Sequence, residues 1–268
     1  MGNEVIRSRQ NRLVKLVCSL DRKKSREEEG LFRFDGIKLC LEAISKGIEP
    51  EYIVVSESRE SEMRDRLGSE RELVIVSDEV FSKMSDERSP EGVITVARTL
   101  SGLHRIVNIP DDEVPSKCER VFLLESIRDP GNLGTIIRTA ASLGIDRVAV
   151  SSDCADIYNP KTIRGAMGAL FMLKIDVIAD GQTEKYISAL RASGRRVFAA
   201  ALDPLAVDIR TQKVLPTDVF VIGNEGHGLC ESTIVSCDGC VIIPMREGCE
   251  SLNAAMAAGI LMWETTRS

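Results

Sequence analysis

The sequence predicts an α/β protein in which a small α/β unit precedes a C-terminal parallel sheet. Short apolar runs alternate with amphipathic helical segments along most of the 268 residues, which is the pattern of an α/β architecture. The apolar runs of the second half show little alternation, as expected for strands covered on both faces. Between the halves, residues 101–118 carry two prolines and an acidic run but little apolar periodicity, which indicates a boundary.

These observations divide the chain into a first domain at residues 1–105, a linker at 106–118 and a second domain at 119–268. In the first domain the apolar spacing predicts helices at 11–20, 36–46 and 60–67, and strands at 31–34, 52–55, 73–76 and 93–97. About a hundred residues is a common size for such a domain.

The second domain alternates strands and helices in the same way. The predicted strands lie at 121–125, 147–151, 170–175, 196–201, 218–222 and 240–243, and the predicted helices at 133–143, 160–168, 183–192, 229–236 and 252–265. Ser251 stands where the last helix would have its N-cap, since serine is among the favoured capping residues.

The composition is that of an ordinary globular protein, with 43% hydrophobic and 28% charged residues. No apolar run approaches the roughly 20 residues of a membrane-spanning helix, and no basic and then apolar leader opens the chain. We therefore expect a cytoplasmic protein.

The eight cysteines are expected to be reduced thiols because no secretory leader accompanies them. Cys237 and Cys240 have the spacing of metal ligands, but a zinc site needs about four ligands. The chain has only two histidines and no second pair of cysteines at this spacing. We therefore expect no metal site.

A basic arm opens a chain whose formal net charge is −6. Between residues 1 and 26 only Glu4 and Asp21 oppose the basic residues Arg7, Arg9, Arg12, Lys15, Arg22, Lys23, Lys24 and Arg26. A charge run can be a solvated helix face, but this local asymmetry favours contact with RNA phosphates. The residues we assign to RNA binding are Arg22, Lys23, Lys24 and Arg26.

Three polar loops follow predicted strands, and ligands of parallel sheets bind at such carboxyl ends. The segments are Arg128 to Ala140, Gly223 to Leu229 and Pro244 to Asn253. The glycines of the second loop are spaced G-x-x-G-x-G, which differs from the G-x-G-x-x-G fingerprint of dinucleotide-binding folds. They indicate instead a close approach of the backbone to a ligand.

In this order, the three segments resemble motifs 1, 2 and 3 of the SpoU (TrmH) family of RNA ribose methyltransferases. The stretches 32–43 and 89–93 resemble the substrate-binding domain of many members, which is similar to ribosomal proteins that bind kinked RNA. The resemblance implies a SPOUT-type sheet with a deep trefoil knot. It also implies that S-adenosylmethionine is bound in a bent form and that a homodimer completes the active site.

The resemblance also carries site residues over to this sequence. Cofactor contacts fall on Gly223, Ile243, Met245 and Leu252, and the catalytic set is Asn132, Arg138, Glu225, Ser251 and Asn253. Arg138 would be a general base or a phosphate anchor, and a guanidinium with a pKa above about 12 favours the anchor. Structural roles remain possible for three of these residues. Asn132 could cap a helix, Glu225 could accept hydrogen bonds from backbone N–H groups of its own loop, and Arg138 could be an exposed residue of the helix surface.

The function that follows is S-adenosylmethionine-dependent 2'-O-methylation of a ribose in structured RNA. The ribosomal-protein-like domain favours ribosomal RNA over transfer RNA. Two alternatives stay open, a different nucleotide-binding α/β enzyme and an RNA-binding protein without catalysis. Small residues between Ala254 and Gly259 would let a second helix approach closely, in keeping with the expected homodimer.

Overall fold

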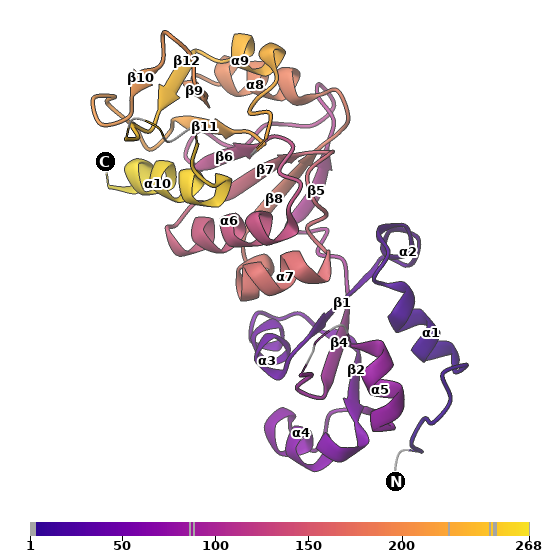
Figure 1. Cartoon of the computed structure of the whole chain (residues 1–268). Coiled ribbons are helices and arrows are strands. Elements are labelled where there is room, and N and C mark those ends of the chain that lie inside the picture. Colours follow the sequence, from indigo (N-terminus) through magenta and orange to yellow (C-terminus); the bar gives the residue numbers. More distant parts are fainter. Residues whose placement is uncertain are drawn as a thin grey trace. The chain divides into compact units, whose positions relative to one another are not determined.

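The fold is taken from a computed structural model, which describes residues 4–85, 87, 89–224, 226–246, 248 and 251–267. The chain forms two compact units (Figure 1). Unit 1 comprises residues 1–100 together with 158–171, and unit 2 comprises residues 101–157 together with 172–268. The prediction of an α/β protein with a smaller N-terminal unit is confirmed.

Unit 1 is built on a mixed sheet whose strand order, among the described residues, is β1-β4-β2-β3. Strand β4 is antiparallel to β1 and β2, whereas β3 is parallel to β2. In chain order the elements are α1 (Arg12–Ser19), α2 (Lys23–Glu29), β1 (Leu31–Asp35), α3 (Ile37–Ser45), β2 (Pro50–Ser56), η1 (Glu57–Arg59), α4 (Glu60–Leu67), β3 (Val74–Val76), α5 (Asp78–Met84), β4 (Val93–Arg98), α7 (Pro160–Ala166) and η2 (Met167–Phe171).

Alternating residues of the central strands point to opposite faces of this sheet, and each face is covered by helices. Val54 joins one cluster with residues of α1 and α5, while its neighbours Ile53 and Val55 join another with residues of α3 and α4. On α1, Val14 and Val17 are buried in the first cluster. The polar side of α1 is therefore left facing away from this core.

Residues 158–171 were predicted as part of the second domain but pack in unit 1. The ring centroids of Phe34 and Phe171 lie 5.2 Å apart, and those of Phe32 and Tyr158 lie 4.6 Å apart. These contacts bury large aromatic area, which fixes the segment against β1. The predicted strand at 170–175 is accordingly wrong, because Leu170 and Phe171 lie in η2 and the strand begins at Lys174.

Unit 2 is built on a sheet whose strand order, among the described residues, is β10-β12-β9-β11-β6-β7-β8-β5. All of these neighbours pair in parallel. The elements are β5 (His104–Val107), β6 (Val121–Leu124), α6 (Pro130–Ser142), β7 (Arg147–Ser151), β8 (Lys174–Ile178), α8 (Thr183–Ala192), β9 (Val197–Ala200), β10 (Val207–Asp208), β11 (Val219–Ile222), α9 (Glu231–Ser236), β12 (Gly239–Ile242) and α10 (Ala254–Thr266).

Helices cover both faces of this sheet, as the apolar strands predicted. Side chains of α8 pack with strand residues such as Leu123, Ala199 and Val221 on one face. On the other face α10 packs along α6 and against β11 (Figure 1). The segment predicted as the start of the linker instead forms β5, which extends the sheet beside β8. The trefoil knot that the resemblance implies stays a prediction.

Helices α10 and α6 have other caps than the predicted helix starts imply. Helix α10 begins at Ala254 with Asn253 as its cap, because the Asn253 Oδ1 accepts hydrogen bonds from the backbone N–H groups of Ala255 and Met256 at 2.9 and 3.3 Å. Ser251 is therefore not the cap. Helix α6 begins at Pro130 and is capped by Asp129, so Asn132 lies within its first turn.

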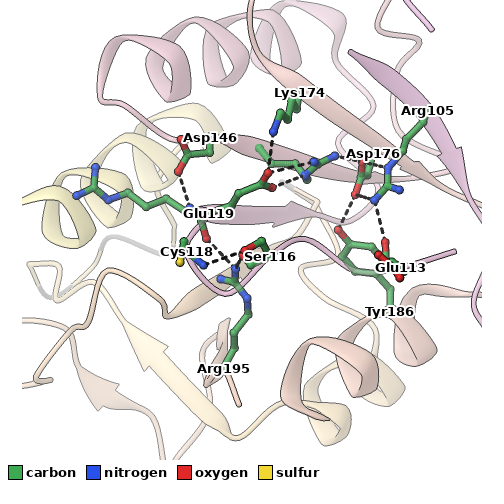
Figure 2. A network of polar contacts seen from close by, with 12 residues as sticks. Arg105, Glu113, Ser116, Cys118, Glu119, Asp146, Lys174, Asp176, Tyr186 and Arg195 are labelled. Atoms are coloured by element: carbon green, nitrogen blue, oxygen red, sulfur yellow. Dashed lines mark hydrogen bonds and ion pairs between the residues drawn. The ribbon is translucent and has the colours of Figure 1, made fainter. Parts of the chain in front are cut away.

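A polar network ties the amino-terminal side of the sheet together (Figure 2). The fully buried Asp176 accepts hydrogen bonds from Arg105 at 2.8 Å, Arg147 at 2.5 Å and the Tyr186 hydroxyl at 2.9 Å. Arg147 and Lys174 also bind Glu119, at 2.9 and 2.7 Å. Burial alone would raise the pKa of Glu119, but these hydrogen bonds outweigh it and lower that pKa.

None of the helices in the part of the chain that the structure describes has the length and apolar character needed to cross a bilayer.

Candidate functional site

A pocket of about 500 Å³ opens in unit 2 at the carboxyl ends of β9, β11 and β12. Its described lining residues come from the ends of these strands and the segments that follow them, at 200–202, 222–224, 226–229, 241–243 and 245. Further lining comes from Ile234 of α9 and, around the start of α10, from residues 251, 252, 254 and 257. This is the edge at which ligands of parallel sheets bind, and the volume is in the usual range for small-molecule sites.

All four residues expected to contact the cofactor line this one pocket, namely Gly223, Ile243, Met245 and Leu252. They come from two strand ends and a helix start that are up to 29 positions apart in the chain (252 − 223). Among the described lining residues, His227 is the single ionisable side chain, so the walls combine apolar side chains with loop backbone.

The glycine loop is closed by a pair of backbone hydrogen bonds between Asn224 and Gly228, at 3.1 and 2.9 Å. Gly228 has a φ of 69°, in the left-handed region. At Gly223 a Cβ atom would lie 2.5 Å from the carbonyl carbon of Gly228 and 2.7 Å from the nitrogen of Leu229. Only glycine permits this approach of the two loop ends, which places backbone at the wall of the pocket.

Asn224 holds the loop in place through both ends of its side chain. Its Oδ1 accepts hydrogen bonds from the backbone N–H groups of Gly226 at 2.8 Å and His227 at 3.2 Å. Its Nδ2 donates to the carbonyl oxygen of Ser126 at 2.8 Å. The glycine loop is thereby fixed to the chain that leaves β6, the strand beside β11.

Ser126 forms a strained corner directly after β6. Its φ of 57° is unusual for a residue with a side chain. The backbone N–H donates to Ser151 Oγ at 2.9 Å and the hydroxyl donates to Asp153 at 2.5 Å. Burial would raise the pKa of Asp153, but hydrogen bonds from both serines outweigh burial and lower it. Asp153 thus stays ionised and holds the corner to which Asn224 binds.

The buried carboxylate of Glu125 supports the far end of the glycine loop. Its Oε2 accepts a hydrogen bond from the backbone N–H of Cys230 at 3.0 Å, and its Oε1 accepts one from the Thr233 hydroxyl at 2.6 Å. These donors belong to the start of α9. Glu125 also raises the pKa of the Cys230 thiol through its negative charge. The end of β6 therefore fixes both sides of the loop.

Two of the expected catalytic residues meet beside the pocket. The Nδ2 of Asn253 donates to the Oδ1 of Asn132 at 3.0 Å, which joins the start of α10 to the first turn of α6. Asn253 stands between Leu252 and Ala254, and both of these line the pocket. Ser251 also lines the pocket and is exposed. The structure therefore brings Asn132 and Asn253 into contact and places Ser251 in the lining of the pocket.

Arg138 stands on the same helix as Asn132, six positions further along α6. It is exposed on α6, is not among the residues that line the pocket, and forms no ion pair with another described residue. Its guanidinium is thus available to an anionic ligand. The remaining catalytic candidate, Glu225, falls outside the described residues.

In unit 1 the expected RNA contacts separate into two groups. Arg22, Lys23 and Lys24 are exposed at the start of α2. Arg26 is only 3% exposed, and its Nη1 donates to the carbonyl oxygen of Leu20 at 2.6 Å. The assignment of Arg26 as an RNA contact is therefore wrong, because its guanidinium is engaged inside the protein.

The cysteine pair with ligand spacing has poorly ionised thiols. Burial, followed by the neighbouring Cys240, raises the pKa of Cys237 to about 12, and the Cys237 thiol donates to the Thr233 carbonyl. Burial likewise raises the pKa of Cys240. Within the described ranges, no cluster of three or more histidine, cysteine or acidic side chains is arranged to hold a metal ion.

Sequence reasoning missed the supporting residues of the pocket. Asn224 was not among the expected site residues, although an asparagine after a strand and before glycines is a common loop-forming residue. The wall formed by Ala200, Ala201 and Leu202 was also missed. The strand at 196–201 that leads into this wall was predicted from sequence. The order of elements along the chain does not reveal that this strand lies between β11 and β12 in the sheet.

Comparison with known families gives two matches along the chain. The model of the SpoU rRNA Methylase family matches residues 119–263. The model of an MRM3-like substrate binding domain matches residues 11–95. The first covers the pocket and the three loops, and the second covers most of unit 1.

Whole-chain relatives point the same way. The chain is 30% identical over 261 residues to the 23S rRNA (guanosine(2553)-2'-O)-methyltransferase of Bacillus subtilis, covering 96% of this chain and 97% of that protein. It is 29% identical over 269 residues to the 23S rRNA (uridine(2479)-2'-O)-methyltransferase of Streptomyces viridochromogenes, covering 98% of this chain and 91% of that protein. The AdoMet-bound rRNA methyltransferase from Sinorhizobium meliloti superposes with a TM-score of 0.81 at 29% identity, covering 98% and 97%.

Proposed function

The chain belongs to the SpoU rRNA methylase family, and from this premise we propose that it methylates a ribose 2'-hydroxyl of ribosomal RNA with S-adenosylmethionine as donor. The observation that carries the proposal is the pocket at the carboxyl ends of β9, β11 and β12, which gathers Gly223, Ile243, Met245 and Leu252. The two relatives named above are 2'-O-methyltransferases of nucleosides with different bases, a guanosine and a uridine. The ribose is therefore the chemistry they share.

The described lining residues fit this cofactor. The apolar side chains of Leu202, Leu229 and Ile243 offer walls for the adenine ring and the methylene groups. The approach of Gly223 to Gly228 brings backbone donors and acceptors to the same wall. When bound, S-adenosylmethionine supplies a sulfonium-activated methyl group, and its transfer to the ribose 2'-oxygen leaves S-adenosylhomocysteine and one proton.

Because the methyl group is already activated, the protein has to align the hydroxyl and assist its deprotonation. We assign alignment to Asn132 and Asn253, which are hydrogen-bonded to each other, and to the hydroxyl of Ser251, which lines the pocket. An arginine side chain suits phosphate binding because its planar fork of N–H donors matches the phosphate oxygens. The role of Arg138 is to hold the phosphate next to the target ribose and to polarise the hydroxyl.

The pocket of one chain lacks Arg138 among its lining residues, so we propose that a second copy supplies it. Helix α10 supports a homodimer. Met256 and Trp263 are 61% and 56% exposed and stand seven positions apart on α10, so they lie on one side of the helix. An apolar stripe of this kind is typical of a surface that is covered by another chain.

The function is tested by incubating the purified protein with labelled S-adenosylmethionine and either unmethylated ribosomal RNA or transfer RNA made by transcription. We expect label in ribosomal RNA, at a 2'-oxygen. Calorimetric titration with S-adenosylmethionine, S-adenosylhomocysteine and NAD separates the alternatives. Binding of NAD without binding of either sulfur compound would contradict a methyltransferase, and binding of none would favour a non-catalytic RNA-binding protein.

The shared site is tested by mixing two impaired variants, Arg138→Ala and Gly223→Ala, at a concentration of S-adenosylmethionine that fills the wild-type pocket but not the altered pocket of Gly223→Ala. A mixed dimer would combine the intact pocket of the first variant with the intact arginine of the second. Random exchange of subunits in a two-fold dimer should then restore about a quarter of wild-type activity. Sedimentation of the wild type as a monomer at micromolar concentration, or no recovery after verified exchange, would count against the shared site.

A further inference from the structure

A basic groove lies on unit 1, remote in sequence from the pocket residues. It has a volume of about 790 Å³ and is lined by one side of α1 and by the turn into α2. Three cations line it, Arg12, Lys15 and Arg22, against one carboxylate, Glu29. In a chain with a net charge of −6, this is a local concentration of positive charge.

Ion pairing distinguishes these cations from the others of the basic arm. Lys23 and Lys24 face Glu27 and Glu28 one helical turn on, at 3.9 and 3.7 Å, and Arg9 pairs with Glu79 at 2.8 Å. Arg12, Lys15 and Arg22 are exposed and form no ion pair with any described residue. Their charges are thus free to attract a polyanion.

The groove has a firm base. Opposite its cations, α1 buries Val14 and Val17 in the core of unit 1. Two buried arginines fix the turn that carries Arg22: Arg26 donates to the carbonyl oxygen of Leu20 at 2.6 Å, and Arg33 pairs with Asp21 at 2.7 Å. The pair with Arg33 also neutralises the carboxylate next to Arg22. The three cations are therefore held on one surface before any ligand arrives.

We propose that this groove binds the phosphate backbone of folded ribosomal RNA through Arg12, Lys15 and Arg22. The inference rests on the proposed function and specifies how its substrate is held. All three residues lie within the 11–95 segment that matches a substrate-binding domain. The structure thus replaces the set expected from sequence: it keeps Arg22, adds Arg12 and Lys15, and removes the three cations that are paired or buried.

Exposure of apolar side chains favours RNA over an anionic membrane as the partner. Binding at a membrane surface adds large apolar side chains to the basic ones. The large hydrophobic side chains with high exposure, such as Leu205 and Trp263, belong to unit 2, and none is found among the described residues of unit 1. The groove therefore offers charge without an apolar anchor.

The test compares two triple variants that lose the same net charge. The groove variant is Arg12→Ala, Lys15→Ala and Arg22→Ala, and the control is Arg9→Ala, Lys23→Ala and Lys24→Ala, which removes paired cations. Affinity for 23S ribosomal RNA made by transcription is measured over a range of salt concentrations. Each lost phosphate contact removes roughly 0.7 to 0.9 from the slope of log affinity against log salt.

We expect the groove variant to lose roughly 2 to 2.7 from that slope and on the order of a hundredfold in affinity at about 0.1 M salt, since three contacts are removed. The control should lose less than about one from the slope. Equal losses of RNA affinity in the two variants, or no loss in either, would contradict RNA binding in the groove. Loss of binding to phosphatidylserine vesicles with RNA binding unchanged would also overturn it.

Two further measurements separate this proposal from the function it rests on. Calorimetric affinity for S-adenosylmethionine should be the same in both variants and the wild type. If the wild type neither binds this cofactor nor methylates RNA while the groove variant alone loses RNA affinity, the methyltransferase proposal is wrong and RNA binding in the groove is supported. If the wild type methylates RNA and the two variants bind RNA alike, the groove fails and the function stands.

Discussion

The replacement Gly223→Ala tests the geometry of the pocket most directly. The added Cβ would lie 2.5 and 2.6 Å from the carbonyl carbon and oxygen of Gly228, and 2.7 Å from the nitrogen of Leu229. All three neighbours are backbone atoms, so no side chain can rotate away to make room. The loop 223–229 must move, and it forms a wall of the pocket. We therefore expect weaker cofactor binding.

Forcing an extra carbon into a packed site costs about 1–3 kcal/mol. If the whole cost falls on binding, the dissociation constant of S-adenosylmethionine rises roughly fivefold to 150-fold. If part of this free-energy cost is already present in the protein without cofactor, the midpoint temperature of thermal unfolding falls by about 2–4 °C per kcal/mol. The two effects together should reach at least about 1 kcal/mol.

Calorimetry with S-adenosylmethionine and thermal unfolding of the same samples measure both parts. Gly226→Ala is a matched control in the same loop, because its Cβ would meet only the Asn224 side chain, at 3.4 Å. That variant should bind and unfold nearly as the wild type does. Should Gly223→Ala match the wild type in both measurements, the close approach of the loop ends would be irrelevant to the pocket.

Three further predictions concern residues around the site and the sheet. Arg138→Ala should keep cofactor affinity but lower single-turnover methylation about a hundredfold, as expected of a group that acts on the transition state; near wild-type rates at saturating RNA would leave Arg138 a surface residue. Glu125→Ala leaves the Cys230 N–H without its acceptor and should lower the free energy of unfolding, measured by chemical denaturation, by about 1–3 kcal/mol. Glu125→Gln can keep that hydrogen bond and should lower the free energy of unfolding much less. The pKa of Glu119 is lowered in the folded state, so its contribution to stability is present above its unfolded pKa of about 4.3 and is lost as pH falls through the lowered pKa. The difference in free energy of unfolding between the wild type and Glu119→Gln should therefore become smaller in acid. A difference that does not change with pH would refute the lowered pKa of Glu119.

The three loops could be predicted from sequence because each is a local pattern. A β-branched or apolar run followed by glycines and polar residues marks a strand end, and the parallel arrangement places such ends at one edge. Gly223, Ile243 and Leu252 consequently line a common pocket. Their neighbours from β9 were not predictable in this way, because strand order is a property of the whole sheet.

Other differences arise where a local pattern allows two outcomes. Ser251 and Asn253 are both good capping residues, and Asn253 is the cap while also donating to Asn132. The apolar pair Leu170 and Phe171 suits a strand or a buried helical turn equally well. Arg26 follows three exposed cations, yet it lies on the inner side of α2, where the carbonyl of Leu20 accepts its hydrogen bond.

The return of residues 158–171 to unit 1 bears on how this protein can be engineered. A fragment that starts at residue 101 would contain α7 and η2 without β1, the strand whose Phe32 and Phe34 cover Tyr158 and Phe171. Such a fragment would expose a new apolar surface and would be prone to aggregate. Chimaeras meant to exchange RNA specificity between relatives therefore need two grafts, one for each stretch of chain, because a single fusion point would divide a packed core.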